Sequence, residues 1–203
     1  MAHKLEVAFV QGTAPVSKII SRFSKHLADD NYKCKFKPSH VFLMLDDTII
    51  FESSTYKRAG DNDEKVMEKG TRLLLLEDID DRIEESLIKR TIISKNCDPY
   101  LALRYAARAS NYHYSYKSIF KFLCKGHLRK DTGRPKDEYI CSGLVLDALR
   151  EQVFLPDKSV QYIINKFKDI DSNSVTPLDL FIAFTEAGYN FRTSKGLPNV
   201  SNL

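Results

Sequence analysis

The sequence contains no tryptophan, no Cys-x-x-Cys pair and no apolar stretch that approaches the length of a membrane span. A helix that crosses a bilayer needs about 20 consecutive apolar residues, so we expect no transmembrane segment. The first residues, MAHKLEVAFVQG, contain only a short apolar run and do not follow the plan of a signal peptide. We therefore expect a cytoplasmic location, which for a viral protein means the host cytoplasm or the virion.

A strong excess of charge of one sign is also missing. The 31 Lys and Arg residues and the 27 Asp and Glu residues give a formal net charge of +4. This excess is too small to indicate a nucleic-acid partner, and we expect none. The chain has four cysteines, which we expect to be free thiols, because disulfide frameworks belong to exported proteins.

The cysteines and histidines do not form a recognisable metal site. Cys124 and His127 have a Cys-x-x-His spacing, and Cys34 lies near His40 in the sequence. A zinc site needs three or four converging ligands, and the sequence has no second closely spaced pair. We therefore expect no metal and no other cofactor.

The composition is that of a globular domain, with 43% hydrophobic and 29% charged residues. A chain of 203 residues is long enough to bury a core, and it shows no internal repeat and no low-complexity linker. We predict a single α+β domain over residues 1–188, with a small antiparallel sheet and several flanking helices. Residues 189–203 have few apolar side chains and are predicted to form a C-terminal tail.

Hydrophobic periodicity, capping residues and turn residues predict the elements of this domain. Asp98, Asp157 and Thr176 are expected to begin helices, and Gly188 is expected to end the last one. Residues 55–70 are rich in charged and turn-forming side chains and are expected to form an irregular connection. Strands are expected over residues 4–10, 40–45, 48–53 and 71–77, and helices over 15–28, 78–96, 98–108, 112–123, from 141 onward, 157–170 and 176–188.

Cys141 stands where a polar loop gives way to an amphipathic helix. A thiol in that position lies in the partial positive charge of the helix N-terminus, which favours the thiolate. Upstream, residues 38–53 read as a hairpin that carries His40 and Glu52. The three side chains are candidates for nucleophile, base and the group that orients the base. The alternatives are a buried structural thiol and a strand histidine with no chemical role.

The register of the hairpin decides whether His40 and Glu52 can meet. Side chains alternate between the two faces along a strand. If the turn comprises residues 46–48, Glu52 pairs with Phe42 and lies diagonally beside His40. If the turn comprises only the first two of these residues, Glu52 lies opposite Val41 and faces away from His40. The proposed triad therefore requires the three-residue turn, or a bulge with the same effect.

Three segments, in this order, resemble the circularly permuted branch of the papain-like NlpC superfamily, in which a strand-borne His precedes a helix-borne Cys. The first is Ser39-His40-Val41, followed by an apolar strand and Glu52. The second is YICSGLV at residues 139–145, and the third is VTPLDL at residues 175–180. The resemblance spans about residues 5–185 and implies a permuted papain-like fold for the domain at 1–188.

The resemblance also implies a thiol mechanism in which Cys141, His40 and Glu52 form the triad. Backbone N–H groups at the start of the Cys141 helix would meet the oxyanion. Tyr139 is a candidate substrate-binding residue, although simple packing explains it equally well. Three departures leave the substrate groove open: Val7-Ala8-Phe9-Val10 replaces a Gly-Asp-aliphatic strand, Phe42 replaces a frequent Gly, and Gly143 replaces a frequent Glu.

Relatives in this superfamily include peptidases and amidases as well as enzymes that act on lipid esters, so the resemblance implies a peptide or acyl substrate. We favour hydrolysis of an amide or peptide bond through a thioester acyl-enzyme, as in a cysteine peptidase of a virus or phage. One alternative is an acyltransferase or thioesterase acting on lipid esters, with an apolar channel at Cys141 and a membrane-docking surface at residues 112–123. Another is a catalytically idle papain-like scaffold that binds a partner. The sequence does not predict the oligomeric state.

Overall fold

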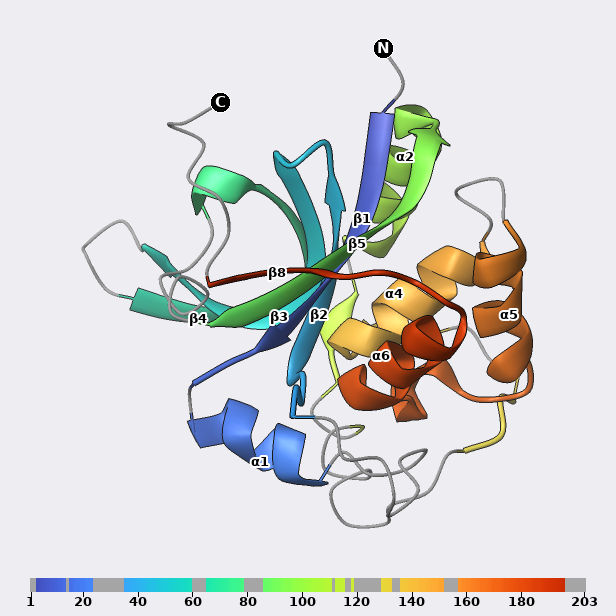
Figure 1. Cartoon of the computed structure of the whole chain (residues 1–203). Coiled ribbons are helices and arrows are strands. Elements are labelled where there is room, and N and C mark those ends of the chain that lie inside the picture. The colour runs from blue at the N-terminus through green and yellow to red at the C-terminus, as the bar shows by residue number, and fades with distance from the viewer. Residues whose placement is uncertain are drawn as a thin grey trace.

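The structure is a computed structural model of the whole chain (Figure 1). It describes residues 3–13, 15–23, 35–59, 65–78, 86–110, 112–115, 118, 129–132, 136–151 and 157–195.

A six-stranded antiparallel sheet forms the centre of the molecule, with the strand order β4-β3-β2-β1-β5-β8. A second, two-stranded sheet pairs β6 with β7 in parallel. The expected mixture of helices with an antiparallel sheet is confirmed at this level. The strands are β1 (His3–Gln11), β2 (His40–Leu45), β3 (Ile49–Ala59), β4 (Lys65–Leu75), β5 (Leu87–Cys97), β6 (His113–Tyr114), β7 (Glu138–Tyr139) and β8 (Arg192–Lys195).

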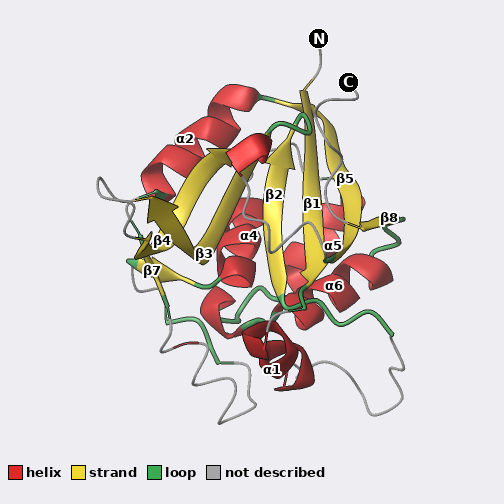
Figure 2. Cartoon of the chain, turned by 90° about the vertical axis from the view of Figure 1, so that its left-hand side faces the viewer, coloured by secondary structure: helices red, strands yellow, loops and turns green. Residues whose placement is uncertain are grey.

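Five α-helices occur in the described part of the chain, and α4, α5 and α6 lie together behind the large sheet in the view of Figure 2. None of the helices formed by the described residues is both long and apolar enough to cross a membrane. The helices are α1 (Pro15–Phe23), α2 (Pro99–Ala109), α4 (Cys141–Arg150), α5 (Lys158–Lys166) and α6 (Pro177–Glu186), with short 3-10 turns η1 (Leu76–Asp78) and η2 (Ser172–Ser174).

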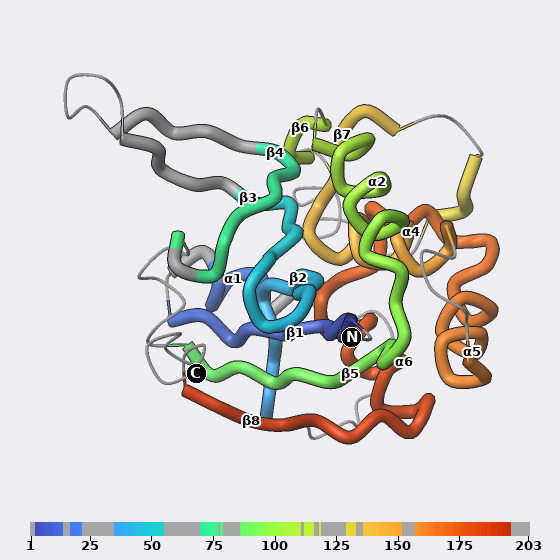
Figure 3. Tube along the Cα trace, turned by 90° about the horizontal axis from the view of Figure 1, so that it is seen from above, coloured from blue at the N-terminus to red at the C-terminus, as the bar shows by residue number. Residues whose placement is uncertain are grey.

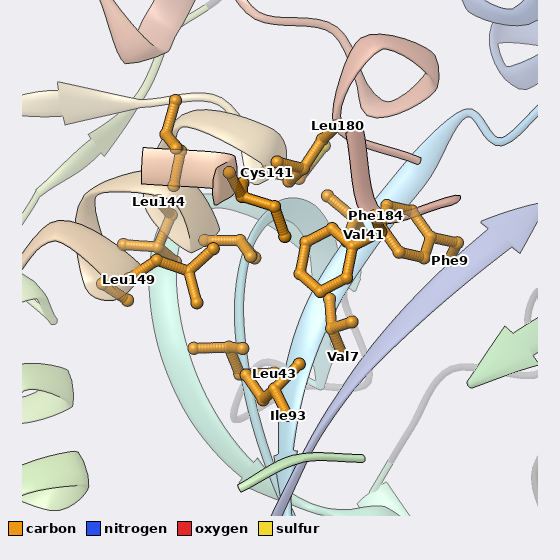
Figure 4. Close-up of a cluster of buried hydrophobic side chains, with 14 of the residues drawn as sticks. Val7, Phe9, Val41, Leu43, Ile93, Cys141, Leu144, Leu149, Leu180 and Phe184 are labelled. Atoms are coloured by element: carbon orange, nitrogen blue, oxygen red, sulfur yellow. The ribbon is translucent and has the colours of Figure 1, made fainter. Parts of the chain in front are cut away.

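The large sheet buries apolar side chains on both faces. Leu5, Val7 and Phe9 alternate along β1 and belong to a buried cluster that includes side chains of α4 and α6 (Figure 4). Ala8 and Val10 point to the other face, where they join a second cluster with side chains of β2, β3, β4 and β5. Because β1 is buried on both faces, its sequence reads as a nearly continuous apolar run.

Three expected helix starts, at Asp98, Asp157 and Thr176, and the expected stop at Gly188 are confirmed. Asp98 and Asp157 cap α2 and α5, with side chains that accept hydrogen bonds from Tyr100 N and Val160 N. Thr176 and Asp179 form a reciprocal capping box at the start of α6. Gly188, with φ of 84°, follows the end of α6, where a left-handed conformation favours glycine.

The expected helix over residues 78–96 is wrong. Residues 87–97 form β5, which pairs with β1 along nearly its whole length. The run Thr91-Ile92-Ile93 favours a strand because β-branched side chains fit a pleated surface. Non-local pairing with β1 therefore overrides the helical spacing of the apolar residues. The first part of the expected helix, residues 79–85, lies outside the described residues.

The region between β3 and β4 also differs from expectation. Residues 55–59 and 65–70 extend the two strands instead of forming an irregular connection. The run at 71–77 was expected to be a buried strand, but Leu73 and Leu75 in β4 are 42% and 46% exposed. β4 is an edge strand, so one of its faces is only partly covered.

Two further expectations are corrected by strand pairing. Residues 113–114, expected to be helical, form β6 beside β7, and most of residues 116–128 lie outside the described part. The expected tail begins with ordered chain, because β8 at residues 192–195 pairs with β5 and extends the sheet (Figure 3). Phe191, just before β8, packs against Phe9 and Phe181. Residues 196–203 lie outside the described part.

Candidate functional site

Cys141 is the first residue of α4, as the sequence predicts, and it is only 5% exposed. Ile140 precedes it as the N-cap residue and has no side-chain cap hydrogen bond. The approach to the helix is held by Asn173, whose Oδ1 accepts from Ile140 N at 3.0 Å and whose Nδ2 donates to Glu138 O at 2.8 Å. The Ser142 hydroxyl donates to Val175 O at 2.6 Å. The helix start is therefore anchored to the chain just before α6.

Gly143 permits this anchoring. A Cβ atom at this position would lie 2.5 Å from Asn173 Oδ1 and 3.1 Å from Ser172 O, which is too close for any side chain without displacement. Gly143 stands where many members of the papain-like family that the sequence resembles have Glu, and this close approach gives a local reason for the glycine. The η2 turn packs directly against the first turn of α4, and only glycine leaves room for it.

The hairpin that carries His40 and Glu52 has the register that the triad requires. Leu43 pairs with Phe51 and Leu45 with Ile49, so residues 46–48 form the turn. Asp46 and Asp47 have φ of 52° and 58°, a left-handed conformation that aspartate tolerates better than most residues. The three-residue alternative of the sequence analysis is confirmed.

A compact set of polar contacts surrounds Glu52, which is 2% exposed. Its Oε2 lies 2.6 Å from His40 Nε2. Its Oε1 accepts from Arg72 Nε at 2.7 Å and from the Ser54 hydroxyl at 2.8 Å, and Arg72 Nη2 lies 2.5 Å from the same oxygen. Both carboxylate oxygens are therefore occupied, one by the imidazole and one by the guanidinium and a hydroxyl.

The electrostatics of the site favour charged forms of both partners. Burial by itself would lower the pKa of His40, but the charge of Cys141 and hydrogen bonding to it, together with Glu52, raise that pKa to about 10. Burial would raise the pKa of Glu52, but hydrogen bonding to His40 and the charges of His40 and Arg72 lower it to about 2. Opposite charges in contact stabilise each other's ionised forms. The imidazolium form of His40 and the carboxylate form of Glu52 are therefore the favoured states at neutral pH.

Cys141 acts on the pKa of His40 through its charge and through hydrogen bonding, so the two side chains are neighbours at the end of the sheet. Strand alternation places His40 on the same face as Phe42, whereas Cys141 belongs to the core on the opposite face (Figure 4). His40 is the first residue of β2, so its ring lies at the end of the strand. Nε2 is bound to Glu52, which leaves Nδ1 for the thiol. The His40 side chain is 21% exposed, so this end of the sheet is open to solvent on the imidazole side.

Tyr139 lies in a different setting from these three residues. Its ring is buried, with its centroid 5.4 Å from that of Tyr112. Its backbone carbonyl accepts from the Ser53 hydroxyl at 2.8 Å, which ties β7 to β3. Its side chain lines a polar pocket between α2 and α4, and Cys141 is not among the described residues that line this pocket. Packing therefore accounts for most of the contacts of Tyr139.

Arg72 is the principal residue of the site that the sequence analysis missed. It lies directly opposite Glu52 in the β3–β4 pairing. The lone arginine in the apolar run TRLLLL was a usable signal, because a charge at a half-buried strand position needs a partner. Because residues 55–70 were expected to form an irregular connection, the β3–β4 hairpin that pairs Arg72 with Glu52 was not predicted. Asn173 was missed because its partners lie on segments far away in sequence.

Metal ligation is a separate question. The described residues contain no group of three or more His, Cys, Asp or Glu side chains that could hold a metal ion. Cys34, Cys124 and His127, from which a zinc site could be imagined, lie outside the described residues. Cys97 is a second buried free thiol, at the end of β5.

Comparison with known proteins adds no family assignment. No protein-family model, no curated protein sequence and no solved structure matches the chain. The relationship to the permuted papain-like proteins stays a prediction from motifs.

Proposed function

We propose that the protein is a cysteine hydrolase that cleaves an amide or peptide bond, with Cys141 as nucleophile, His40 as base and Glu52 as the residue that orients His40. The observation that carries the proposal is the contact between Glu52 and His40, together with the effect of Cys141 on the His40 imidazole. The 2.6 Å contact between Glu52 and His40 and the raised pKa of His40 are what a thiolate–imidazolium pair needs.

The roles follow from the chemistry of acyl transfer. The Cys141 thiolate attacks the carbonyl carbon, and the C–N bond then breaks as the His40 imidazolium gives its proton to the leaving amine. The product is a thioester on Cys141. His40 next takes a proton from water, the hydroxide attacks the thioester, and the carboxylic acid leaves with regeneration of the thiolate. Backbone N–H groups in the first turn of α4 are the candidate donors to the oxyanion.

The chain order and the architecture support a permuted papain-like fold as part of this proposal. His40 and Glu52 on adjacent antiparallel strands precede Cys141 at a helix start, and α4 packs on the sheet. The trailing segment Thr176-Pro177 begins α6, which packs against α4. A cytoplasmic or virion location belongs to the same proposal.

The test is to trap the acyl-enzyme. The protein is incubated with panels of peptide, isopeptide and lipid ester substrates, and intact mass spectrometry reads any added acyl group. We expect an adduct from a peptide or isopeptide that hydroxylamine removes, as it removes thioesters. Cys141→Ala should abolish the adduct, whereas the matched variant Cys97→Ala, at a second buried free thiol, should retain it.

The same panel separates the alternatives. Adducts from lipid esters alone would indicate an acyltransferase or thioesterase. No adduct from any substrate, with Cys141 alkylated no faster than Cys97, would indicate a catalytically idle scaffold.

A further inference from the structure

A polar pocket of about 300 Å³ lies between α2, α4 and the chain around β7. It is separate from the Cys141 site. Arg150, which lines the pocket, follows Cys141 by nine positions on α4, or two and a half helical turns, and therefore points to the opposite side of the helix. Along the helix axis the two residues are about 13 Å apart. The proposed hydrolase chemistry does not use this pocket.

The inner charges of the pocket are paired with one another. Lys136 Nζ and Arg150 Nη1 each lie 2.9 Å from a different oxygen of Asp147. Lys136 also lies 2.5 Å from the Ser172 hydroxyl, and Arg150 Nη2 donates to Ile170 O at 2.8 Å. These charged groups already make contacts within the protein, and the contacts hold α4 against the chain around η2.

The outer charges are different. Arg108, in the last turn of α2, and Glu151, just after α4, are both exposed and line the same pocket. Among the residues that the structure describes, neither has an ion-pair partner, and they do not pair with each other. An exposed cation and an exposed anion, neither ion-paired within the described part of the chain, thus line one pocket.

Tyrosine side chains form the remaining wall. Tyr112 and Tyr139 lie against each other, and Tyr105 adds a third ring from α2. Burial, followed by nearby charge, raises the pKa of Tyr105 and of Tyr139, so both hydroxyls stay protonated at neutral pH. The wall therefore offers aromatic surface and neutral hydroxyl groups.

We propose that this pocket binds a small zwitterion of the amino-acid or dipeptide class. Arg108 would bind the carboxylate, Glu151 would bind the ammonium, and the tyrosine rings would cover an apolar side chain. A ligand with a single charge would leave one rim residue unused. The volume is at the lower end of the range for small-molecule sites, which suits a ligand of this size.

The test measures binding of L-phenylalanine by titration calorimetry and saturation-transfer NMR, in the Cys141→Ala background so that no derivative is turned over. N-acetyl-phenylalanine lacks the ammonium, and phenylalanine amide lacks the carboxylate. We expect saturable binding of phenylalanine, with each derivative weaker by about tenfold or more, because each loses one charge-assisted contact.

Variants assign the contacts. Arg108→Gln should lower the affinity for phenylalanine about tenfold and leave the affinity for phenylalanine amide unchanged. Glu151→Gln should also lower the affinity for phenylalanine about tenfold, and it should leave the affinity for N-acetyl-phenylalanine unchanged. Arg104→Gln, at an exposed arginine on the same helix outside the pocket, is the matched control and should bind as the parent does. Absence of saturable phenylalanine binding at millimolar concentration, or equal binding of all three compounds, would overturn the proposal. Neither result bears on acyl-enzyme formation at Cys141.

Discussion

Glu52 and Glu6 are two buried carboxylates on the same face of the same sheet. Glu6 pairs with Met44 across β1 and β2, Met44 pairs with Ile50, and Glu52 follows Ile50 by two positions on β3. The partners of the two carboxylates differ in kind. Glu52 is bound by an imidazole and one arginine, with both oxygens occupied. Glu6 is surrounded by permanent cations, because Lys4 and Arg90 lie 3.3 Å and 3.5 Å from it and Arg192 contacts it from β8.

The difference separates a structural charge from one suited to proton transfer. Arginine and lysine keep their charge over the whole ordinary pH range. Arg90 and Arg192 tie β5 and β8 to β1 through their ion pairs with Glu6. Histidine is the side chain that changes charge under mild conditions. Of these two sites, it is the Glu52 site that places a buried carboxylate against a side chain of this kind.

The largest expected contrast is in the reactivity of Cys141. Glu52→Gln should slow its alkylation by iodoacetamide at neutral pH by roughly 10²-fold, because the imidazolium that stabilises the thiolate loses its carboxylate. Glu6→Gln should leave the rate nearly unchanged. Quenched time courses with peptide mapping measure each thiol separately. Equal rates in the two variants would remove the distinction between the carboxylates.

The free energy of unfolding, unlike the alkylation rate, should respond clearly to a change at Glu6. Glu6→Gln should lower the free energy of unfolding by about 2 kcal/mol, because it removes a fully buried carboxylate from the cations around it. Arg90 keeps Asp47 as an ion-pair partner at 2.8 Å. Urea denaturation measures the change. Glu186→Gln, which removes an exposed partner of Lys166, serves as control and should change stability by less than about 1 kcal/mol. A Glu6 variant as stable as this control would show that the network is dispensable.

The pH dependence of stability should distinguish the sites. The pKa of His40 rises from 6.5 to about 10, so its stabilising contribution is fully present below pH 6.5 and is lost as pH rises through 10. The pKa of Glu52 falls from 4.5 to about 2, so its contribution is present above pH 4.5 and is lost as pH falls through 2. We expect the stability difference between wild type and His40→Asn to shrink between pH 6.5 and 10, whereas the effect of Glu6→Gln stays constant there. A flat His40 difference would contradict the ion pair.

The smallest contrast concerns the two arginines. Arg72→Lys should lower the free energy of unfolding by about 1.5 kcal/mol, because lysine cannot reproduce the two contacts of the guanidinium with Glu52 Oε1. Arg192→Lys should change it by less than about 0.5 kcal/mol, since the Arg192 side chain is 58% exposed. Thermal unfolding of both variants gives the comparison. Similar losses would mean that the geometry at Glu52 is not special.

Several of the elements that the sequence predicted correctly are specified by local contacts. Asp157 caps α5 by accepting a hydrogen bond from the backbone N–H three residues later. Thr176 and Asp179 cap α6 by reciprocal hydrogen bonds, each between one residue's side chain and the other's backbone N–H. The turn at Asp46 and Asp47 is likewise local, and its three-residue form was one of two alternatives open from the sequence. Such signals act over three or four residues, so they can be recognised without knowing the rest of the fold.

The errors fall where distant segments decide the structure. The apolar spacing of residues 78–96 matched a helix, but pairing with β1 makes residues 87–97 a strand. β8 consists of polar residues and is held by hydrogen bonds to β5 and by the contact of Arg192 with Glu6. Arg72 lies opposite Glu52 because β3 pairs with β4, and this pairing joins residues 20 positions apart in the sequence.

The sequence by itself determined the helix start at Cys141, the capped helices that follow it, and the order of His40, Glu52 and Cys141 along the chain. The tertiary structure decided which side chains meet. It brought the His40 ring and Arg72 to Glu52, and it made room for η2 at Gly143. The physical reason is that a cap needs only its own helix, whereas a strand pair or a buried ion pair forms only when distant segments leave water together.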